Sequence, residues 1–305
     1  MSRQPTRRPA LPAAALLAAA LALAGCGTVA PRAADPLPAS AATATVPAHD
    51  NLNAVLWVQG SVEFRALSET VFRAAGARLD AALADPAWDA LVPAERAAAG
   101  DAAGLPPAII LDIDETVLDN SPYQARMVVD GTSFDDATWD AWVEERRAIP
   151  MPGARELTRA AAEKGITVFY ISNRTVESTP ATLDNLRRQG LPVQHDEVFL
   201  GLGMQVPGCE QAGSGKSCRR QAVGRTHRVL MQFGDQLGDF VQAPANTPED
   251  HAALHAEYRD WFGERWWVLP NPTYGGWESA PLRGERGLDE DQRRDRKREA
   301  LRLDR

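Results

Sequence analysis

The sequence predicts an α/β fold in which a parallel sheet carries helices on both faces, with a helical segment before it and a small inserted cap. The first observation is a series of short apolar runs separated in several places by stretches with helical spacing. The apolar runs lie at 108–114, 166–172, 197–201, 228–234 and 266–270, and the helical stretches at 153–164, 177–190 and 249–262. Strands that alternate with helices form parallel sheets covered on both faces. The second observation is that polar residues directly follow several of these strands, where such sheets bind ligands.

Residues 1–25 have the features of a bacterial lipoprotein signal peptide. Three arginines form a basic head before an Ala- and Leu-rich core. The segment Leu23-Ala24-Gly25-Cys26 resembles a lipobox, in which Cys26 would be lipidated. An ordinary signal peptide and a single anchor helix are the alternatives, although the run is short for a membrane span. Gly27 stands where an inner-membrane retention signal often has Asp, which favours the outer membrane, facing the periplasm, with the lipid as the only membrane contact.

The segment that follows the lipobox predicts a linker. Residues 26–50 are rich in Ala, Pro and Thr without an apolar period, so we expect a flexible tether. From residue 51 apolar residues recur at helical spacing, which predicts one or two amphipathic helices over 51–85. The globular domain is expected to span 51–282.

The charge of the chain argues against a nucleic-acid polymer as partner. The net charge is −8, and removal of residues 1–25 takes away three arginines and no acid, which leaves −11. A chain this acidic, without a basic stripe, binds a polyanion poorly. A small phosphorylated substrate is compatible with this charge, because a cation and a few local donors can offset it.

Two carboxylates end the first predicted strand. Asp112 and Asp114 alternate along the chain, so both can face one substrate. One carboxylate can attack a phosphoryl group, and its neighbour can protonate the leaving oxygen and later deprotonate water. Two anions near a phosphate dianion require a cation, and Mg²⁺ prefers carboxylate and phosphate oxygens. The pattern therefore predicts a Mg²⁺-dependent phosphoryl-transfer site.

Two segments depart from the strand and helix alternation. Residues 117–150 contain Trp139 and Trp142 and end in prolines, which predicts a cap over the sheet edge. These tryptophans and Tyr274 either pack the cap or stack on an aromatic leaving group such as a nucleobase. Residues 283–305 hold nine basic and seven acidic residues, which is typical of a solvated helix or a disordered tail.

The cysteines fit an oxidising compartment. Lipidation of Cys26 would leave Cys209 and Cys218 as an even pair, either bridged by a disulfide or present as two thiols. A zinc site is disfavoured, because only two sulfurs are present and no histidine lies between them.

Four segments resemble the motifs of the haloacid dehalogenase-type phosphohydrolases, in order. They are "ILDIDETVLDNSPYQ", "VFYISNR", "GKSCRR" and "FGDQLGDF". The segments "NAVLWVQGSVEFRAL" and "LPNPTYGGWE" resemble the class C acid phosphatase branch, also called the lipoprotein 5′-nucleotidase family, so the resemblance covers about 51–280. It implies a Rossmann-like domain of the haloacid dehalogenase type that hydrolyses phosphomonoesters.

The resemblance also implies roles for the residues at the first and last motifs. Asp112 would be the nucleophile and a Mg²⁺ ligand, and Asp114 the general acid and base, with its backbone carbonyl on the metal. Asp235 would complete the protein ligands, and Asp239 would assist directly or through water. Gln236 departs from the usual Asn, and its longer amide would change the contacts around these ligands.

The two middle motifs supply the implied phosphate site. Ser172 would donate a hydrogen bond to a phosphoryl oxygen, and Asn173 and Arg174 would shape the same wall. Lys216 would neutralise the phosphate and the aspartyl intermediate.

The sequence thus predicts a membrane-tethered, Mg²⁺-dependent acid phosphatase or 5′-nucleotidase that acts on small phosphomonoesters, nucleotides first among them. Two rivals are considered. One is a phosphotransferase, in which an alcohol replaces water in the second step. The other is an inactive, ligand-binding surface lipoprotein, which would have no need to keep Asp112, Asp114, Lys216 and Asp235 together.

Overall fold

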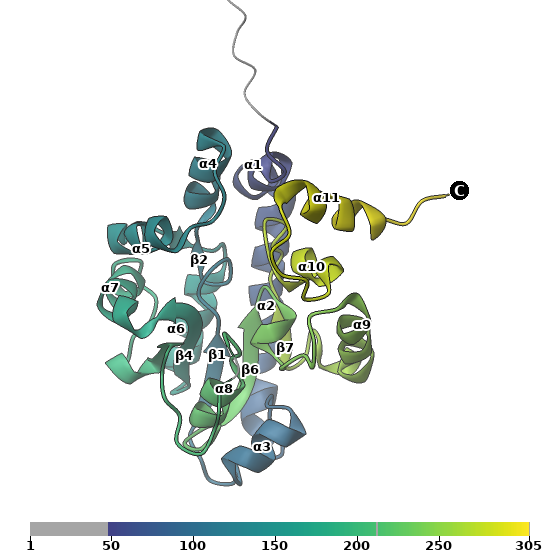
Figure 1. Cartoon of the computed structure of the whole chain (residues 1–305). Coiled ribbons are helices and arrows are strands. Elements are labelled where there is room, and N and C mark those ends of the chain that lie inside the picture. The colour runs from purple at the N-terminus through teal and green to yellow at the C-terminus, as the bar shows by residue number, and fades with distance from the viewer. Residues whose placement is uncertain (1–47, 212, 305) are drawn as a thin grey trace, which may run out of the picture. The chain divides into compact units, whose positions relative to one another are not determined.

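The computed structural model describes residues 48–211 and 213–304 (Figure 1). The predicted signal peptide, Cys26 and the tether up to residue 47 lie outside these residues. Within the described part of the chain, no helix has both the length and the apolar character needed to cross a membrane.

A five-stranded parallel sheet forms the centre of the domain, as the sequence predicts. The strands stand in the order β5-β4-β1-β6-β7. They are β1 (Pro107–Leu111), β4 (Thr167–Thr175), β5 (Phe199–Leu202), β6 (Arg228–Gly234) and β7 (Trp266–Val268). Most of their residues are apolar because the sheet is covered on both faces. The chain runs outward from β1 through β4 to β5 on one side, and through β6 to β7 on the other. The end of β1 is therefore the point at which the strand order reverses, where such sheets bind ligands.

Helices cover both faces of the sheet (Figure 1). On one face α2 (Val62–Ala84) contacts α6 (Ala154–Glu163), and on the other α3 (Pro93–Ala99) contacts α8 (Ser217–Gly224). The remaining helices of the sheet domain are α7 (Thr179–Arg188) and α9 (Pro248–Glu257), with single 3₁₀ turns at Val176–Ser178, Asp196–Val198, Leu237–Asp239 and Arg259–Trp261.

The N-terminal helical segment consists of two helices, α1 (Leu52–Gly60) and α2. Ser61 separates them, and its hydroxyl caps α2 by accepting a hydrogen bond from the Phe64 backbone N–H at 3.0 Å. The buried side chains of α2 recur every three to four residues, and among them Phe72 stacks on Phe233 of β6 at 5.8 Å between ring centroids. This apolar stripe attaches the segment to the sheet.

The predicted cap forms a small unit between β1 and α6. It contains β2 (Leu118–Asp119), α4 (Ser121–Asp130), α5 (Asp136–Glu145) and β3 (Ile149–Pro150), and β2 pairs with β3 in an antiparallel ribbon. The helix α4 contacts α1, and α5 contacts α7. The insertion is therefore attached to both the N-terminal segment and the sheet domain.

The C-terminal region differs from a free tail. After α10 (Gly276–Ser279) and a 3₁₀ turn at Ala280–Leu282, residues Glu290–Glu299 form α11. None of the α11 residues is buried, as expected for a solvated helix. Yet Arg294 pairs with Asp50 and Lys297 pairs with Glu278, so ion pairs hold this helix on the domain.

Candidate active site

The polar residues that end the strands meet at one edge of the sheet. Asp112 and Asp114 follow β1, and Asp235 follows β6. Ser172 to Arg174 lie near the C-terminal end of β4. The backbone N–H of Asp112 donates to the carbonyl of Phe233 on β6 at 2.9 Å, which continues the strand pairing up to the first carboxylate. Parallel pairing of β1 with both neighbours therefore brings these three segments together.

Three buried carboxylates form the centre of the site. Asp112, Asp235 and Asp239 each offer an oxygen within 4.8 Å of the others. Burial and the neighbouring carboxylates raise the pKa of Asp112 to about 7, and the same causes raise the pKa of Asp235 well above its ordinary value. A hard divalent cation would remove this repulsion, and its usual ligands are carboxylate oxygens. The residues therefore fit a divalent metal.

Local backbone structure makes this cluster possible. Asp239 lies against Gly234, where any Cβ would overlap its side chain. The Asp239 carboxylate also accepts a hydrogen bond from the Gln236 backbone N–H at 2.9 Å. The Gln236 side chain accepts from the Gly276 backbone N–H at 3.0 Å, so the longer amide at this position contacts the C-terminal segment.

Lys216 provides the positive charge of the cluster. Its ammonium donates to Asp112 and, at 2.7 Å, to Asp239. Burial lowers the pKa of Lys216, but the two carboxylates outweigh burial and hold that pKa above its ordinary value. The amine therefore stays protonated beside Asp112.

A disulfide lies beside Lys216. The structure joins Cys209 to Cys218, two residues after the lysine. Arg219 also holds this loop, by donating to the carbonyls of Ser214 and Gly215, each at 3.1 Å. The loop that carries the lysine is thus constrained at two points.

Asp114 is held by a hydrogen-bond network on its other side. The Arg174 guanidinium donates to it through Nη2 at 2.8 Å and through Nε at 3.0 Å, and Asn120 donates at 2.9 Å. Ser172 Oγ donates to Asp114 at 3.2 Å. Both Ser172 and Arg174 are buried, so here they position Asp114, and their contact with a phosphate stays a prediction.

Asn173 differs from its two neighbours because its side chain is exposed. Its Oδ1 accepts a hydrogen bond from Arg219 Nη2 at 2.8 Å. Of the three residues at the end of β4, Asn173 therefore presents the most accessible polar group to the site.

The three aromatic residues proposed for stacking have different surroundings. Trp142 is buried, with 2% of its surface exposed, and its Nε1 donates to Asn120 Oδ1 at 2.8 Å. The stacking interpretation is therefore wrong for Trp142. This side chain packs inside the cap because it lies on the buried face of α5. Trp139 lines a cavity and lies 5.6 Å from the Arg174 guanidinium. Tyr274 lines that cavity and also borders the carboxylates.

Sequence reasoning missed two residues that shape the site. Glu115 has a left-handed backbone, with φ of 59°, and accepts hydrogen bonds from the Asn120 backbone and from the Tyr274 hydroxyl. Burial, followed by the charge of Asp114, raises the pKa of Glu115 to about 8. Asn271 donates to Asp235 at 2.8 Å. Both residues lie in segments that resemble family motifs, and this resemblance was the signal that could have identified them.

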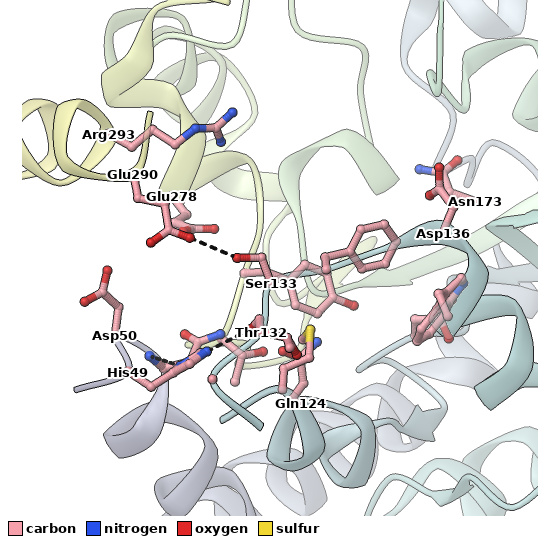
Figure 2. A pocket seen from close by; sticks show the side chains of 18 of the residues that line it. His49, Asp50, Gln124, Thr132, Ser133, Asp136, Asn173, Glu278, Glu290 and Arg293 are labelled. Atoms are coloured by element: carbon pink, nitrogen blue, oxygen red, sulfur yellow. Dashed lines mark hydrogen bonds between the residues drawn. The ribbon is translucent and has the colours of Figure 1, made fainter. Parts of the chain in front are cut away.

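Two hollows adjoin at the site. A smaller pocket of about 560 Å³, the candidate catalytic pocket, contains Asp112, Lys216 and Asp239. A larger cavity of about 1100 Å³ lies between the cap and the C-terminal region, and Figure 2 shows side chains that line it. Asp114, Asn173 and Tyr274 border both hollows. A phosphate at Asp112 would therefore carry its leaving group into the larger cavity.

Comparison with known proteins places the chain in a family. The model of the HAD superfamily, subfamily IIIB (acid phosphatase), matches residues 42–277. The class C acid phosphatase from Bacillus anthracis has a similar structure, with a TM-score of 0.70 and 33% identity over 83% of this chain and 97% of that one. The same enzyme with tungstate bound gives a TM-score of 0.70 and 32% identity.

Similarity to curated relatives covers less of each protein. Acid phosphatase 1 of Solanum lycopersicum is 30% identical over 54% of this chain and 57% of its own length. Vegetative storage protein 2 of Arabidopsis thaliana is 25% identical over 54% of this chain and 55% of its own. The chain thus spans little more than half the length of these relatives. The family model, however, matches most of the chain, and the protein therefore belongs to the acid phosphatases of HAD superfamily subfamily IIIB.

Proposed function

We propose that this protein is a Mg²⁺-dependent phosphomonoesterase that works through an aspartyl-phosphate on Asp112. The observation that carries the proposal is the ion pair of buried Asp112 with Lys216, beside the carboxylates of Asp235 and Asp239. A buried nucleophile paired with a permanent cation, at the open end of a parallel sheet, suits attack on a phosphate.

The first step transfers the phosphoryl group to the protein. An Asp112 carboxylate oxygen attacks phosphorus, and the bond from phosphorus to the ester oxygen breaks. Asp114 gives a proton to that leaving oxygen. Lys216 stays protonated and offsets the charge of the phosphoryl group.

The second step restores Asp112. Asp114 takes a proton from a water molecule, the water oxygen attacks phosphorus, and the acyl-phosphate bond breaks to release inorganic phosphate. Arg174 and Ser172 orient Asp114 in both steps. Mg²⁺, when bound by Asp112, Asp235 and Asp239 and the Asp114 carbonyl, would supply positive charge between the carboxylates and the phosphate.

The larger cavity supports an aromatic leaving group, which makes nucleoside 5′-monophosphates the first substrate candidates. Tyr274 and Trp139 line the cavity, and aromatic faces stack on nucleobases. The Bacillus anthracis class C acid phosphatase was solved with tungstate bound, and tungstate is a tetrahedral oxyanion like phosphate, which supports a phosphate-binding role for this fold.

A storage or ligand-binding role is the rival that one observation favours, since two relatives are named vegetative storage proteins. The arrangement of Lys216 on Asp112 and Asp239 argues against it here, because a purely ligand-binding protein has no need of a nucleophile held this way.

The test is an assay of purified protein against a panel of phosphomonoesters, with Mg²⁺ and with EDTA. We expect phosphate release that EDTA abolishes and Mg²⁺ restores. No release from any ester at any pH from acidic to weakly alkaline would contradict the proposal. Addition of an acceptor alcohol, followed by product analysis, measures transfer against hydrolysis.

We further propose that a lipid on Cys26 anchors the protein to the outer membrane from the periplasm. The support is the lipobox and the tether at 26–50, most of which lies outside the described residues. Cys26→Ala should release an active, unlipidated protein from the membrane fraction. Normal membrane fractionation of this variant would rule the anchor out.

A further inference from the structure

The outer wall of the larger cavity includes the C-terminal helix α11, which lies beyond the residues matched by the family model. Four of its side chains line the cavity: Glu290, Arg293, Arg294 and Lys297. The catalytic pocket meets this cavity at Asp114, Asn173 and Tyr274. A leaving group that extends from the catalytic pocket therefore approaches α11.

Three of the four α11 side chains are occupied in holding the helix. Arg294 Nε donates to Asp50 at 2.9 Å, and Lys297 pairs with Glu278. Glu290 accepts a hydrogen bond from Ser133 Oγ of the cap at 3.3 Å, as Figure 2 shows. Because α11 buries no residue, these polar contacts are what attach it to the rest of the domain.

Arg293 is the fourth side chain, and it is available. It forms no ion pair with any residue that the structure describes, and its Nε donates only to the Leu288 carbonyl at 3.3 Å. Figure 2 shows its guanidinium extending from α11 past Glu290 at the edge of the cavity. A guanidinium presents several fixed donors that match a phosphate or carboxylate, so a free one beside a substrate cavity is suited to an anion.

Two unpaired carboxylates in the cavity make the positive charge of Arg293 important for binding an anion. Asp136 and Asp140 also line the cavity and form no ion pair within the described residues. In a chain of net charge −8, these groups would repel an anionic leaving group unless a cation compensates.

We propose that Arg293 binds a second phosphate carried by the leaving group, remote from the scissile ester, so that α11 selects substrates with two phosphates. This inference rests on the proposed function, because it assumes that the scissile phosphate occupies the pocket at Asp112. It assigns a specificity role to a segment outside the family match.

The experiment compares a nucleoside 5′-monophosphate with the corresponding nucleoside 3′,5′-bisphosphate. KM is measured for both, with product analysis to follow loss of the 5′-phosphate, and Kd is measured by calorimetry in the Asp112→Asn background. We expect the bisphosphate to bind about three- to ten-fold more tightly, as a partly exposed charged hydrogen bond allows. Arg293→Ala should remove this difference, and Arg293→Lys should keep part of it.

Two further variants test the geometry. Arg298→Ala is the matched control, since Arg298 stands on the same helix, pairs with Asp295 and lines neither hollow. It should keep the full preference. Arg294→Ala/Lys297→Ala breaks two of the helix attachments and should lose the preference as Arg293→Ala does.

Equal Kd values for the two nucleotides in the Asp112→Asn protein with Arg293 intact would overturn the inference. So would an Arg293→Ala substitution that changes both Kd values by the same factor. The calorimetric readout separates it from the proposed function. Preference for the bisphosphate without turnover by the wild-type protein would sink the phosphatase proposal and leave the Arg293 site standing. Turnover of both nucleotides without a preference for the bisphosphate would support the phosphatase proposal and overturn the Arg293 site.

Discussion

Asp112 is a buried carboxylate that forms an ion pair with Lys216, and this pair is the basis of the first prediction. Asp112→Asn keeps the shape of the side chain but removes the nucleophile. We expect kcat to fall by about a thousand-fold or more, as losses of covalent catalysis usually show. Stability should change little, because Asn relieves the repulsion among the carboxylates while Lys216 keeps Asp239 as its ion-pair partner. Initial rates and thermal unfolding measure both effects.

The matched control for this variant is Asp119→Asn in the same motif. Asp119 accepts a hydrogen bond from the Ser121 backbone N–H at 2.8 Å, which is a local turn contact, and it lines neither hollow. Its variant should stay within a few-fold of wild-type activity. More than about a tenth of wild-type activity in Asp112→Asn would exclude Asp112 as nucleophile.

Tyr274 combines a ring that faces the cavity with a hydroxyl bound to Glu115. If the ring stacks on a base, Tyr274→Ala should raise KM about ten-fold more for a nucleoside monophosphate than for a small aliphatic phosphate, because stacking contributes roughly 1–3 kcal/mol. Tyr274→Phe keeps the ring and should keep the ratio of the two KM values. Equal shifts for both substrates in Tyr274→Ala would reduce the ring to packing.

At the scale of elements, the loop before α8 places Lys216 beside Asp112 and Asp239. It contains Gly213 and Gly215, and such a segment loses much backbone entropy when it is ordered. The Cys209–Cys218 disulfide reduces this loss by narrowing the ensemble of the loop. Cys209→Ser/Cys218→Ser should lower kcat/KM by about three- to thirty-fold, equivalent to roughly 0.7–2 kcal/mol.

The affinity for Mg²⁺ is the internal control of this prediction. The proposed metal ligands lie on other segments, so the double variant should bind Mg²⁺ almost as well as wild type. The effect should stay moderate, because Arg219 still holds the loop carbonyls. Unchanged kinetics in the double variant, or free thiols in the purified native protein, would contradict the role of the bridge.

For the whole molecule, the carboxylate cluster couples stability to pH and metal. In the metal-free fold, the pKa of Asp112 is raised from 3.8 to about 7 and that of Glu115 from 4.5 to about 8, with burial the main cause. The protonated Asp112 and Glu115 side chains therefore contribute fully to the free energy of unfolding below pH 4, and this contribution is lost as pH rises through 7 and 8. Metal-free protein should accordingly gain more from Mg²⁺ at pH 8 than at pH 5, where protons compete for the same oxygens.

Thermal unfolding at both pH values, with Mg²⁺ and with EDTA, measures this coupling. At a concentration of about one hundred times Kd, Mg²⁺ should add about 2.7 kcal/mol to the free energy of unfolding. Asp235→Asn/Asp239→Asn, which removes two of the proposed ligands, should lose most of the response. A larger Mg²⁺ effect at pH 5 than at pH 8 would contradict a metal site built on these carboxylates.

The sequence by itself determined the sheet and the position of its polar ends. Short apolar runs such as 108–111 and 228–234 predict buried strands because both faces are covered, and parallel strands place their carboxyl ends at one edge. The convergence of Asp112, Asp114 and Asp235 follows from that rule. The role of Lys216 came from the motif resemblance, since nothing in its local spacing indicates that it reaches Asp112.

Only the tertiary structure decided which side chains turn inward. Trp139 and Trp142 stand three residues apart on α5, and the packing of that helix leaves one in the cavity and buries the other against Asn120. Glu115 has a left-handed backbone, and its carboxylate accepts hydrogen bonds from the nearby Asn120 N–H and from the hydroxyl of Tyr274, which lies on a segment distant in sequence.

The position of α11 depended on tertiary structure most of all. Its sequence has charged and amide side chains and no apolar stripe, so periodicity cannot predict a partner surface. Asp50 and Glu278, far apart in sequence, stand where Arg294 and Lys297 can pair with them. Ion pairs between distant segments depend on where the whole fold places each charge, whereas burial of an apolar stripe can be read from local periodicity alone.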